Sequence, residues 1–304
     1  MAEITAALVK QLREMTGAGM MECKKALVEA DGDIDKAIDI LRTRGLAASA
    51  KKAGRATNEG TVATFISEDG KKGAMVELQC ETDFVGMNAT FKEFANLLAE
   101  LAALSNPSDV ESFKKVKVAD FIEYDGKADE TVESMLVDKI STIGENMNIA
   151  QVVTDYVDDE GQIASYIHMG GKIGDLVKFA FDKAETAKNE KFEEFAHDVA
   201  MQVAASVPLA ARREDIAQDV IDHEMNIYKA QAEQSGKPEA IQEKIAAGRL
   251  EKFYKESVLT EQAFIKDPDK SIAQLKSEVE KDADDKIEII NFHRFVLGEG
   301  NDEE

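Results

Sequence analysis

The sequence of 304 residues has few cysteines, few aromatic residues and no long apolar run. The two cysteines, Cys23 and Cys80, are too few for a disulfide framework and are typical of a reducing cytoplasm. No stretch approaches the roughly 18 uninterrupted apolar residues that a membrane-spanning helix needs. The N-terminus lacks a basic start followed by a long apolar core, so no signal peptide is expected. These absences predict a cytoplasmic protein.

Basic residues are outnumbered, because 37 Lys and Arg stand against 60 Asp and Glu and give a net charge of −23. A field of this sign repels phosphate backbones and anionic membrane surfaces. The chain is therefore expected to bind neither nucleic acid nor membrane directly, and a protein is the expected partner. An apolar content of 44% and a charged content of 32% are typical of a folded chain, and the length allows more than one domain.

Motifs for bond chemistry are missing as well. The phosphate-binding pattern G-x-x-x-x-G-K-[ST] does not occur. The four histidines are scattered and neither cysteine has a histidine nearby in sequence, so we expect no metal site and no cofactor. Glu81 and Asp83 lie close together after a strand-like segment, but no nucleophile accompanies them. We therefore expect no catalytic residues, and a binding protein rather than an enzyme.

The first 45 residues predict three short helices from apolar residues at helical spacing. Glycines are expected to end the first helix near residues 16–19 and the third at Gly45, and Asp33 is the expected N-cap of the third. This predicts a three-helix domain at residues 1–45, followed by a helical linker at residues 46–58. The linker carries three basic residues that are expected to form a solvated face: Lys51, Lys52 and Arg55.

An internal repeat follows the linker, since residues 59–107 align with residues 160–208 without a gap. EGTVATFISEDGKKGAMVEL in the first copy matches EGQIASYIHMGGKIGDLVKF in the second. The identical pairs include Gly60/Gly161, Phe91/Phe192 and Phe94/Phe195. Each copy has two alternating runs about a Gly-containing turn, typical of a β-hairpin, and then an amphipathic helix. The repeat predicts an α+β fold with two related subdomains of antiparallel sheets and helices, at residues 59–158 and 159–300.

The second subdomain carries an insertion at residues 214–257. Two polar helical stretches are joined by SGKP and have the pattern of a coiled-coil-like helical hairpin. Its apolar residues are expected to face one another, with Ile216, Val220 and Ile227 on the first arm and Ile241, Ile245 and Leu250 on the second. Whether the hairpin forms a homodimer or contacts a partner is left open. Residues 286–298 predict a late strand that rejoins the core, and residues 301–304 an acidic tail.

The stretch CETDFVG at residues 80–86 follows a strand-like run, and the second copy has FDKAETA in its place. A residue kept only for the shared fold should have a counterpart in the sister copy, and Asp83 and Phe84 have none. In one reading Phe84 covers the core of its own half. In the other, the pair performs a task that belongs to the first half alone, and the asymmetry of the repeat favours this second reading.

Three motifs carry a family resemblance. LREMTGAGMMECKKAL at residues 12–27 closely resembles the N-terminal signature of the bacterial elongation factor Ts family. ELQCETDFV at residues 77–85 resembles its second signature, and IGEN at residues 143–146 a third shared stretch. The resemblance covers nearly the whole chain in family order. It departs at Gly86-Met87, where a small and then a basic residue are usual, and the chain ends soon after GEG, where some members carry a C-terminal module.

The resemblance implies a guanine-nucleotide exchange factor for elongation factor Tu, the GTPase that delivers aminoacyl-tRNA. It implies that the protein binds the GDP-bound partner, displaces its Mg²⁺ and promotes GDP release without bond chemistry of its own. It also implies a ubiquitin-associated-like fold for the first domain. By resemblance, the residues that dislocate Mg²⁺ in the partner are Thr82, Asp83, Phe84 and Val85, and those that bind the partner are Arg13, Met20, Met21, Ile143, Gly144 and His168. One of the two methionines is also expected to pack in the core of its domain.

Two other classes stay open. A scaffold that uses the small helical domain and the hairpin for oligomeric contacts would bind its partner without faster nucleotide release. A hydrolase would show turnover in an assay.

Overall fold

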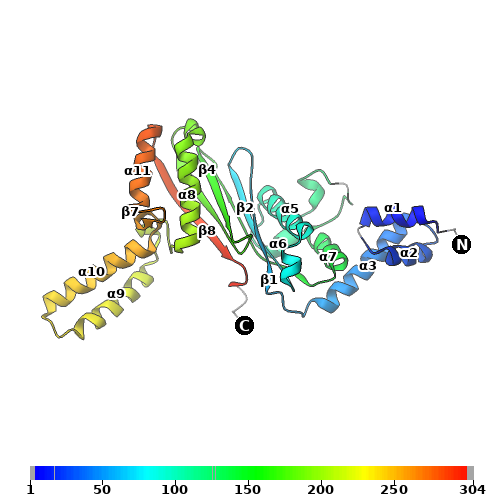
Figure 1. Ribbon diagram of the computed structural model, residues 1–304, viewed down its shortest axis with the longest axis horizontal. Helices are drawn as coiled ribbons and strands as arrows, with labels where there is room; N and C mark the ends of the chain where they lie inside the picture. The colour runs from blue at the N-terminus through cyan, green and yellow to red at the C-terminus, as the bar shows by residue number, and fades with distance from the viewer. Residues whose placement is uncertain (1–3, 17, 125, 127, 300–304) are drawn as a thin grey trace. The chain divides into compact units, whose positions relative to one another are not determined.

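The computed structural model describes residues 4–16, 18–124, 126 and 128–299. The predictions that concern Gly17 and the tail at residues 301–304 lie outside the described residues. The fold combines helices with antiparallel sheets, so the predicted α+β class is confirmed (Figure 1). The chain divides into two compact units, one of Met1–Ala63, Val76–Val153 and Leu297–Glu304, and one of Thr64–Met75 and Thr154–Val296. The predicted domain limits stay predictions.

The first unit begins with three helices, α1 (Ala6–Thr16), α2 (Met20–Glu29) and α3 (Ile34–Lys52). Asp33 caps α3 as predicted, since its carboxylate accepts the Lys36 backbone N–H at 3.1 Å. The helices share one small apolar core, formed by Val9, Leu12, Cys23, Ala26, Leu27, Ala30 and Ala37. Within the described part of the chain, no helix is long and apolar enough to cross a membrane.

The prediction that the third helix ends at Gly45 is wrong, because α3 continues to Lys52. Its C-terminal half packs against α7 (Val132–Ile143), and a Cβ on the buried Gly45 would lie 3.6 Å from the side chain of Ser141. The glycine therefore lies at a close helix contact and not at a helix end. Much of the predicted linker is the second half of a single helix.

The rest of the first unit builds on the larger part of the sheet β1–β2–β3, which has the strands β1 (Glu59–Ile66), β2 (Lys72–Cys80) and β3 (Met147–Tyr156). The strand β2 leads into α4 (Asp83–Gly86), which is followed by α5 (Ala89–Ser105), α6 (Val110–Lys114) and the 3-10 helix η1 (Val118–Asp120). Four large side chains of α5 are almost completely buried: Phe91, Phe94, Leu98 and Leu101.

The second unit is built on the antiparallel sheet β4–β5–β8, with β4 (Gly161–His168), β5 (Ile173–Phe181) and β8 (Ile287–Val296). The helix α8 (Glu190–Ser206) packs on this sheet, and the rings of Phe192 and Phe195 meet Phe179 edge to face. The strand β8 pairs with β5, so the predicted late strand that rejoins the core is confirmed. The remaining elements are η2 (Ala184–Lys188), η3 (Arg213–Asp215), η4 (Leu259–Glu261), β6 (Ala263–Phe264), β7 (Asp267–Ser271) and α11 (Ile272–Ala283).

The repeat is visible in the structure and extends beyond the aligned sequence. In both copies a hairpin leads to a helix of 17 residues, α5 or α8, capped by an asparagine side chain. A helix of 12 residues then precedes the third strand in both, α7 before β3 and α11 before β8. The shared glycines have a steric cause, since a Cβ on Gly60 would lie 2.2 Å from the Leu78 carbonyl oxygen and one on Gly161 2.3 Å from that of Phe179.

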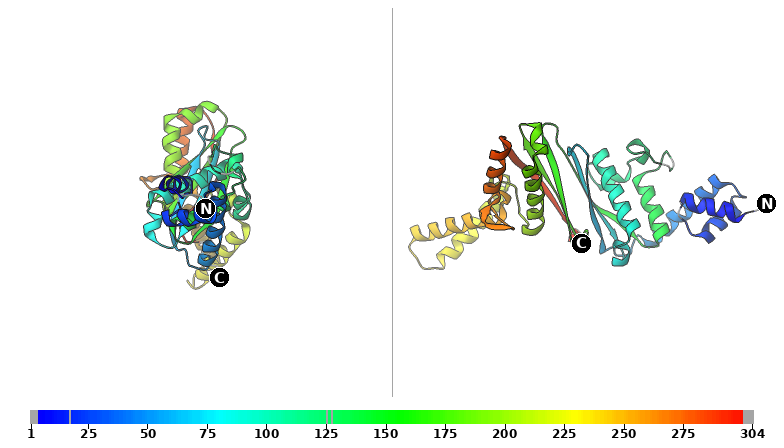
Figure 2. Two further views of the ribbon diagram at one scale, coloured as in Figure 1. Left: turned by 90° about the vertical axis from the view of Figure 1, so that its right-hand side faces the viewer. Right: turned by 45° about the horizontal axis from the view of Figure 1, so that its top comes forward.

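The insertion forms two helices, α9 (Gln218–Glu233) and α10 (Glu239–Ser257), which lie side by side as a hairpin (Figures 1 and 2). The predicted apolar seam is wrong in part, because Val220, Ile227 and Ile241 are exposed. The residues buried in the two helices are instead Ala232 and Ala246 near the turn and Tyr254 at the base. Small alanines let the two helices approach closely, which leaves the longer residues outside. A homodimer through this hairpin stays a prediction.

The helix ends of the repeat predict a stabilising substitution. Asn106 after α5 and Val207 after α8 both have the left-handed conformation, with φ of 48° and 45°. Asparagine tolerates this region and a β-branched residue does not, at a difference of roughly 1 kcal/mol. Val207 is exposed, so little packing is lost on replacement. We expect Val207→Asn to raise the free energy of unfolding by about 1 kcal/mol in urea denaturation, with Asn106→Val lowering it as the reciprocal control. An unchanged midpoint in both variants would contradict the expectation.

Candidate functional site

The stretch CETDFVG forms an exposed tip at the end of β2. Thr82 caps the short helix α4, and its hydroxyl accepts the Val85 backbone N–H at 3.4 Å. The side chain of Phe84 is 81% exposed, so the interpretation that it covers the core is wrong. Asp83 is also exposed, and Val85 is partly buried. An aromatic ring held in water by a capped turn is typical of a contact surface rather than of packing.

Gly86 and Met87, where the sequence departs from the family pattern, differ in their surroundings. Gly86 is buried against β1, and a Cβ there would lie 3.1 Å from the carbonyl oxygen of Gly60. A side chain at this position would require a small shift between the tip and the strand. Met87 is exposed, three residues after Phe84, and adds a second apolar side chain to the tip.

The tip is fastened to the turn between α7 and β3. The Glu145 carboxylate accepts the Thr82 backbone N–H at 3.0 Å and the Thr82 hydroxyl at 2.7 Å. Ile143 and Gly144 directly precede this carboxylate, so the structure brings them beside the tip. Gly144 is exposed with φ of 93°, and a Cβ there would meet no atom within 4 Å. Sequence reasoning placed Glu145 in a family motif but gave it no role.

A second carboxylate fastens the tip to the end of α3. Glu81 accepts the Asn146 backbone N–H at 2.6 Å and the Arg55 guanidinium at 3.2 Å, and the Asn146 side chain donates to the Arg55 carbonyl oxygen at 2.8 Å. The hydrogen bond from Asn146, together with Arg55, lowers the pKa of Glu81. Lys52 donates to the Ile140 carbonyl oxygen at 3.1 Å. The prediction of a solvated basic face is therefore wrong for Lys52, which is half-buried, whereas Arg55 is exposed as predicted and pairs with Glu81 at the surface.

The three predicted partner-binding residues of the small domain are all at its surface. Arg13 is exposed on α1, and Met20 and Met21 at the start of α2 are 56% and 64% exposed. The expectation that one methionine packs in the core is wrong. A hollow of about 400 Å³ beside Met21 is lined by Met21, Lys24, Lys25, Val28, Glu29 and Arg44. Exposed methionines beside charged side chains suit an adaptable protein contact.

His168 belongs to the second unit, at the end of β4. Its ring stacks on Tyr166 at 5.9 Å between centroids, and the Tyr166 hydroxyl lies 3.2 Å from His168 Nδ1. The imidazole is exposed and is held in place by the tyrosine.

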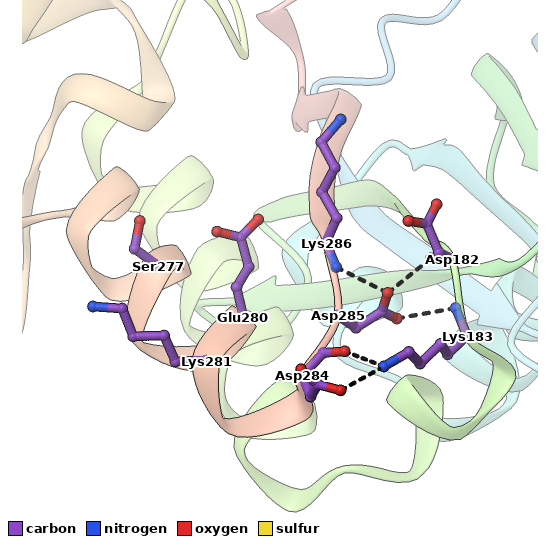
Figure 3. A pocket seen from close by; sticks show the side chains of 8 residues that line it. All are labelled: Asp182, Lys183, Ser277, Glu280, Lys281, Asp284, Asp285 and Lys286. Carbon is purple, nitrogen blue, oxygen red and sulfur yellow. Dashed lines mark hydrogen bonds and ion pairs between the residues drawn. The ribbon is translucent and has the colours of Figure 1, made fainter.

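A charged hollow of about 590 Å³ lies at the second copy's counterpart of the tip (Figure 3). It is lined by Asp182, Lys183, Ser277, Glu280, Lys281, Asp284, Asp285 and Lys286. Asp285 accepts the backbone N–H groups of Lys183 and Lys286, and Lys183 pairs with Asp284 (Figure 3). No group of three or more potential ligands that could hold a metal ion occurs among the described residues.

Comparison with known proteins gives consistent matches over this chain. The family model described as elongation factor TS matches residues 81–299. The chain is 48% identical over 297 residues to an elongation factor Ts of Clostridium botulinum (strain Alaska E43 / Type E3), covering 98% of this chain and 94% of that protein. The elongation factor Ts of Clostridium perfringens (strain 13 / Type A) gives the same identity and coverage.

Proposed function

We propose a function from one premise: the chain belongs to the elongation factor Ts family. In this proposal it is a guanine-nucleotide exchange factor that binds the GDP-bound form of elongation factor Tu in the cytoplasm. It displaces the partner's Mg²⁺ and promotes GDP release, with no bond chemistry of its own. We also propose that the three-helix domain has the ubiquitin-associated-like fold that the resemblance implies.

The physical requirement is differential affinity. GTPases hold GDP tightly through phosphate-loop amides, a lysine and Mg²⁺. An exchange factor accelerates release only if it binds the nucleotide-free partner better than the loaded one, since a ligand with equal affinity for two states shifts nothing. In this proposal Phe84 inserts beside the metal site and Asp83 competes for nearby hydrogen-bond donors. Thr82 and Val85 hold the backbone of the tip.

One observation carries the proposal: the solvent-exposed ring of Phe84 on a tip that is fastened by side-chain hydrogen bonds. A side chain kept for folding would be buried, and the matching position in the second copy is the exposed Glu185. The tip thus supplies an aromatic anchor that the fold itself does not use. Arg13, Met20 and Met21, with Ile143 and Gly144, are proposed to grip the GTPase domain, and His168 another part of the partner.

The test is the release rate of a fluorescent GDP from elongation factor Tu with and without this protein, in stopped flow. We expect a concentration-dependent acceleration that saturates. Tight binding without acceleration would instead support the scaffold, and GDP release equal to the spontaneous rate without binding would overturn both.

The exposed methionines of the small domain predict a change in affinity. We expect the double change Met20→Ala, Met21→Ala to weaken the complex about tenfold, because two exposed apolar contacts together contribute about 1.4 kcal/mol. The saturating rate of GDP release should change little. Met15→Ala, which is also exposed in the same domain, is the matched control. Titration by calorimetry and stopped flow gives both quantities, and a lower saturating rate at unchanged affinity would contradict the assignment.

A further inference from the structure

We propose that Glu145 is a positioning residue for nucleotide exchange, which sets the orientation of the tip that carries Phe84. The inference rests on the proposed function, and it assigns a role to a residue that does not itself meet the nucleotide. Glu145 acts through Thr82, the residue that caps α4.

The contacts explain why one carboxylate can fix the tip. The two oxygens of Glu145 accept different donors of the same residue, the Thr82 backbone N–H at 3.0 Å and the Thr82 hydroxyl at 2.7 Å. Hydrogen bonds to an ionised carboxylate are the stronger kind, and two from one residue fix its rotation as well as its distance. The helix α4 has only four residues and no core of its own. Its direction therefore depends on how Thr82 is held.

We call the two hydrogen bonds from Thr82 to the Glu145 carboxylate the clamp. The residues beside the clamp also connect the tip with the small domain. Glu81, next to Thr82, is bonded to Asn146, next to Glu145, and to Arg55 beyond the end of α3. Lys52 at the end of α3 is bonded to α7. The helix α3 is continuous from the three-helix core to this network. The helix α3 and this hydrogen-bond network thus connect the small domain, which carries Arg13, Met20 and Met21, with the tip that carries Phe84, all within the first unit.

The second copy contains a related clamp without the aromatic residue, in which the hydroxyl donor is Thr186, the counterpart of Val85 rather than of Thr82. Asp285 occupies the place of Glu145 before the third strand, and it accepts the Asp182 and Lys183 backbone N–H groups at 3.3 and 3.0 Å (Figure 3). It also accepts the Thr186 hydroxyl. These hydrogen bonds outweigh burial and lower the pKa of Asp285. A carboxylate clamp is therefore part of the shared fold, and only the first copy uses it to hold an exposed phenylalanine. The chain supplies its own matched control.

The experiment compares Glu145→Gln with Asp285→Asn in stopped-flow GDP release over a range of protein concentrations. We expect Glu145→Gln to lower the saturating rate about tenfold and to change the half-saturating concentration by less than about twofold. The reason is that a small displacement of an acting group, here the Phe84 ring, lowers a rate by about one to two orders of magnitude. Asp285→Asn should leave the saturating rate and the half-saturating concentration within about twofold of the wild-type values. It should lower the melting temperature by about as much as Glu145→Gln does. In a Phe84→Ala background, Glu145→Gln should add less than about a twofold further loss, because coupled residues are not additive.

Hydrogen exchange of the Thr82 amide gives a readout that does not depend on a variant. In the free wild-type protein this amide should exchange slowly, and rapid exchange would overturn the clamp. Full activity of Glu145→Gln, equal losses in Glu145→Gln and Asp285→Asn, or a loss that multiplies with that of Phe84→Ala would each overturn the positioning role. Failure of the wild-type protein to accelerate GDP release would overturn the proposed function itself, which is a separate result.

Discussion

Phe84→Ala should slow catalysed GDP release at least tenfold and leave the melting temperature of the free protein unchanged. Loss of a desolvated aromatic anchor at an interface costs about 2 kcal/mol or more, which is a factor of tenfold or greater in rate. A buried phenylalanine would behave differently, because its removal costs roughly 3–5 kcal/mol of folding free energy. The ring of Phe84 is 81% exposed, so the fold loses almost nothing with it.

The controls come from the same unit. Phe121→Ala removes a phenylalanine that is 41% exposed, and it should leave the rate of GDP release unchanged. Asp83→Ala should slow release less than Phe84→Ala, because a charge at the rim of an interface contributes less to binding than a ring that the partner buries. Stopped-flow GDP release beside a thermal melt separates the outcomes. Full activity of the Phe84→Ala protein would remove the ring from the exchange mechanism.

The elements with strong local signals were predictable from the sequence. Two hairpins, two helices of equal length and the N-cap at Asp33 follow from alternation, helical spacing and capping chemistry. The repeat alone indicated that Phe84 is not needed for the shared fold, since its counterpart in the second copy is Glu185. A tip that differs between two copies of one fold is a signal for function that needs no structure.

What sequence reasoning missed depends on tertiary contact. A glycine in a helical pattern indicates a helix end, but Gly45 lies inside α3 because α7 packs against it. The clamp at Glu145 was hidden because the repeat loses its sequence identity before this point, although helix lengths and caps persist in α7 and α11. The prediction of an apolar seam in the hairpin was wrong for a related reason, since alanines rather than long apolar residues are buried between the two helices.

Removal of one buried charge should stabilise the protein. Asp175 on β5 is fully buried, and neither carboxylate oxygen accepts a well-formed hydrogen bond within the part of the chain that the structure describes. Burial raises the pKa of Asp175 to about 8, although the Arg294 guanidinium on the neighbouring strand and the nearby Tyr166 backbone N–H oppose this shift. The aligned residue of the first copy is Ala74, also fully buried, so the shared fold does not need an acid here. We expect Asp175→Ala to raise the free energy of unfolding at pH 8 by roughly 3 kcal/mol.

The sign of the pH dependence follows from proton binding. Below the ordinary aspartate pKa, 3.8, the carboxyl is protonated in both the folded and the unfolded chain and no electrostatic penalty exists. Between that value and about 8 the folded chain holds a proton that the unfolded chain has released, so rising pH favours unfolding. Above about 8 the folded chain carries the buried charge and the penalty is constant. The stability difference between Asp175→Ala and wild type should therefore grow from pH 4 to pH 8.

Two substitutions that keep the shape of the side chain, Asp175→Asn and Glu77→Gln, test whether the charge of Asp175 or the volume of its side chain lowers the free energy of unfolding. Asp175→Asn should reproduce much of the gain at pH 8, because it removes the charge and keeps the shape. Glu77→Gln should destabilise the protein, since this equally buried carboxylate accepts the Gln79 and Gln151 side chains at 2.7 and 2.8 Å. Urea denaturation at pH 4.5, 6.5 and 8 gives the free energies. If Asp175→Asn raises the free energy of unfolding equally at all three pH values, ionisation of Asp175 is not the cause. If the rise appears only as the pH increases, the buried carboxylate is the group that lowers the stability of the second unit.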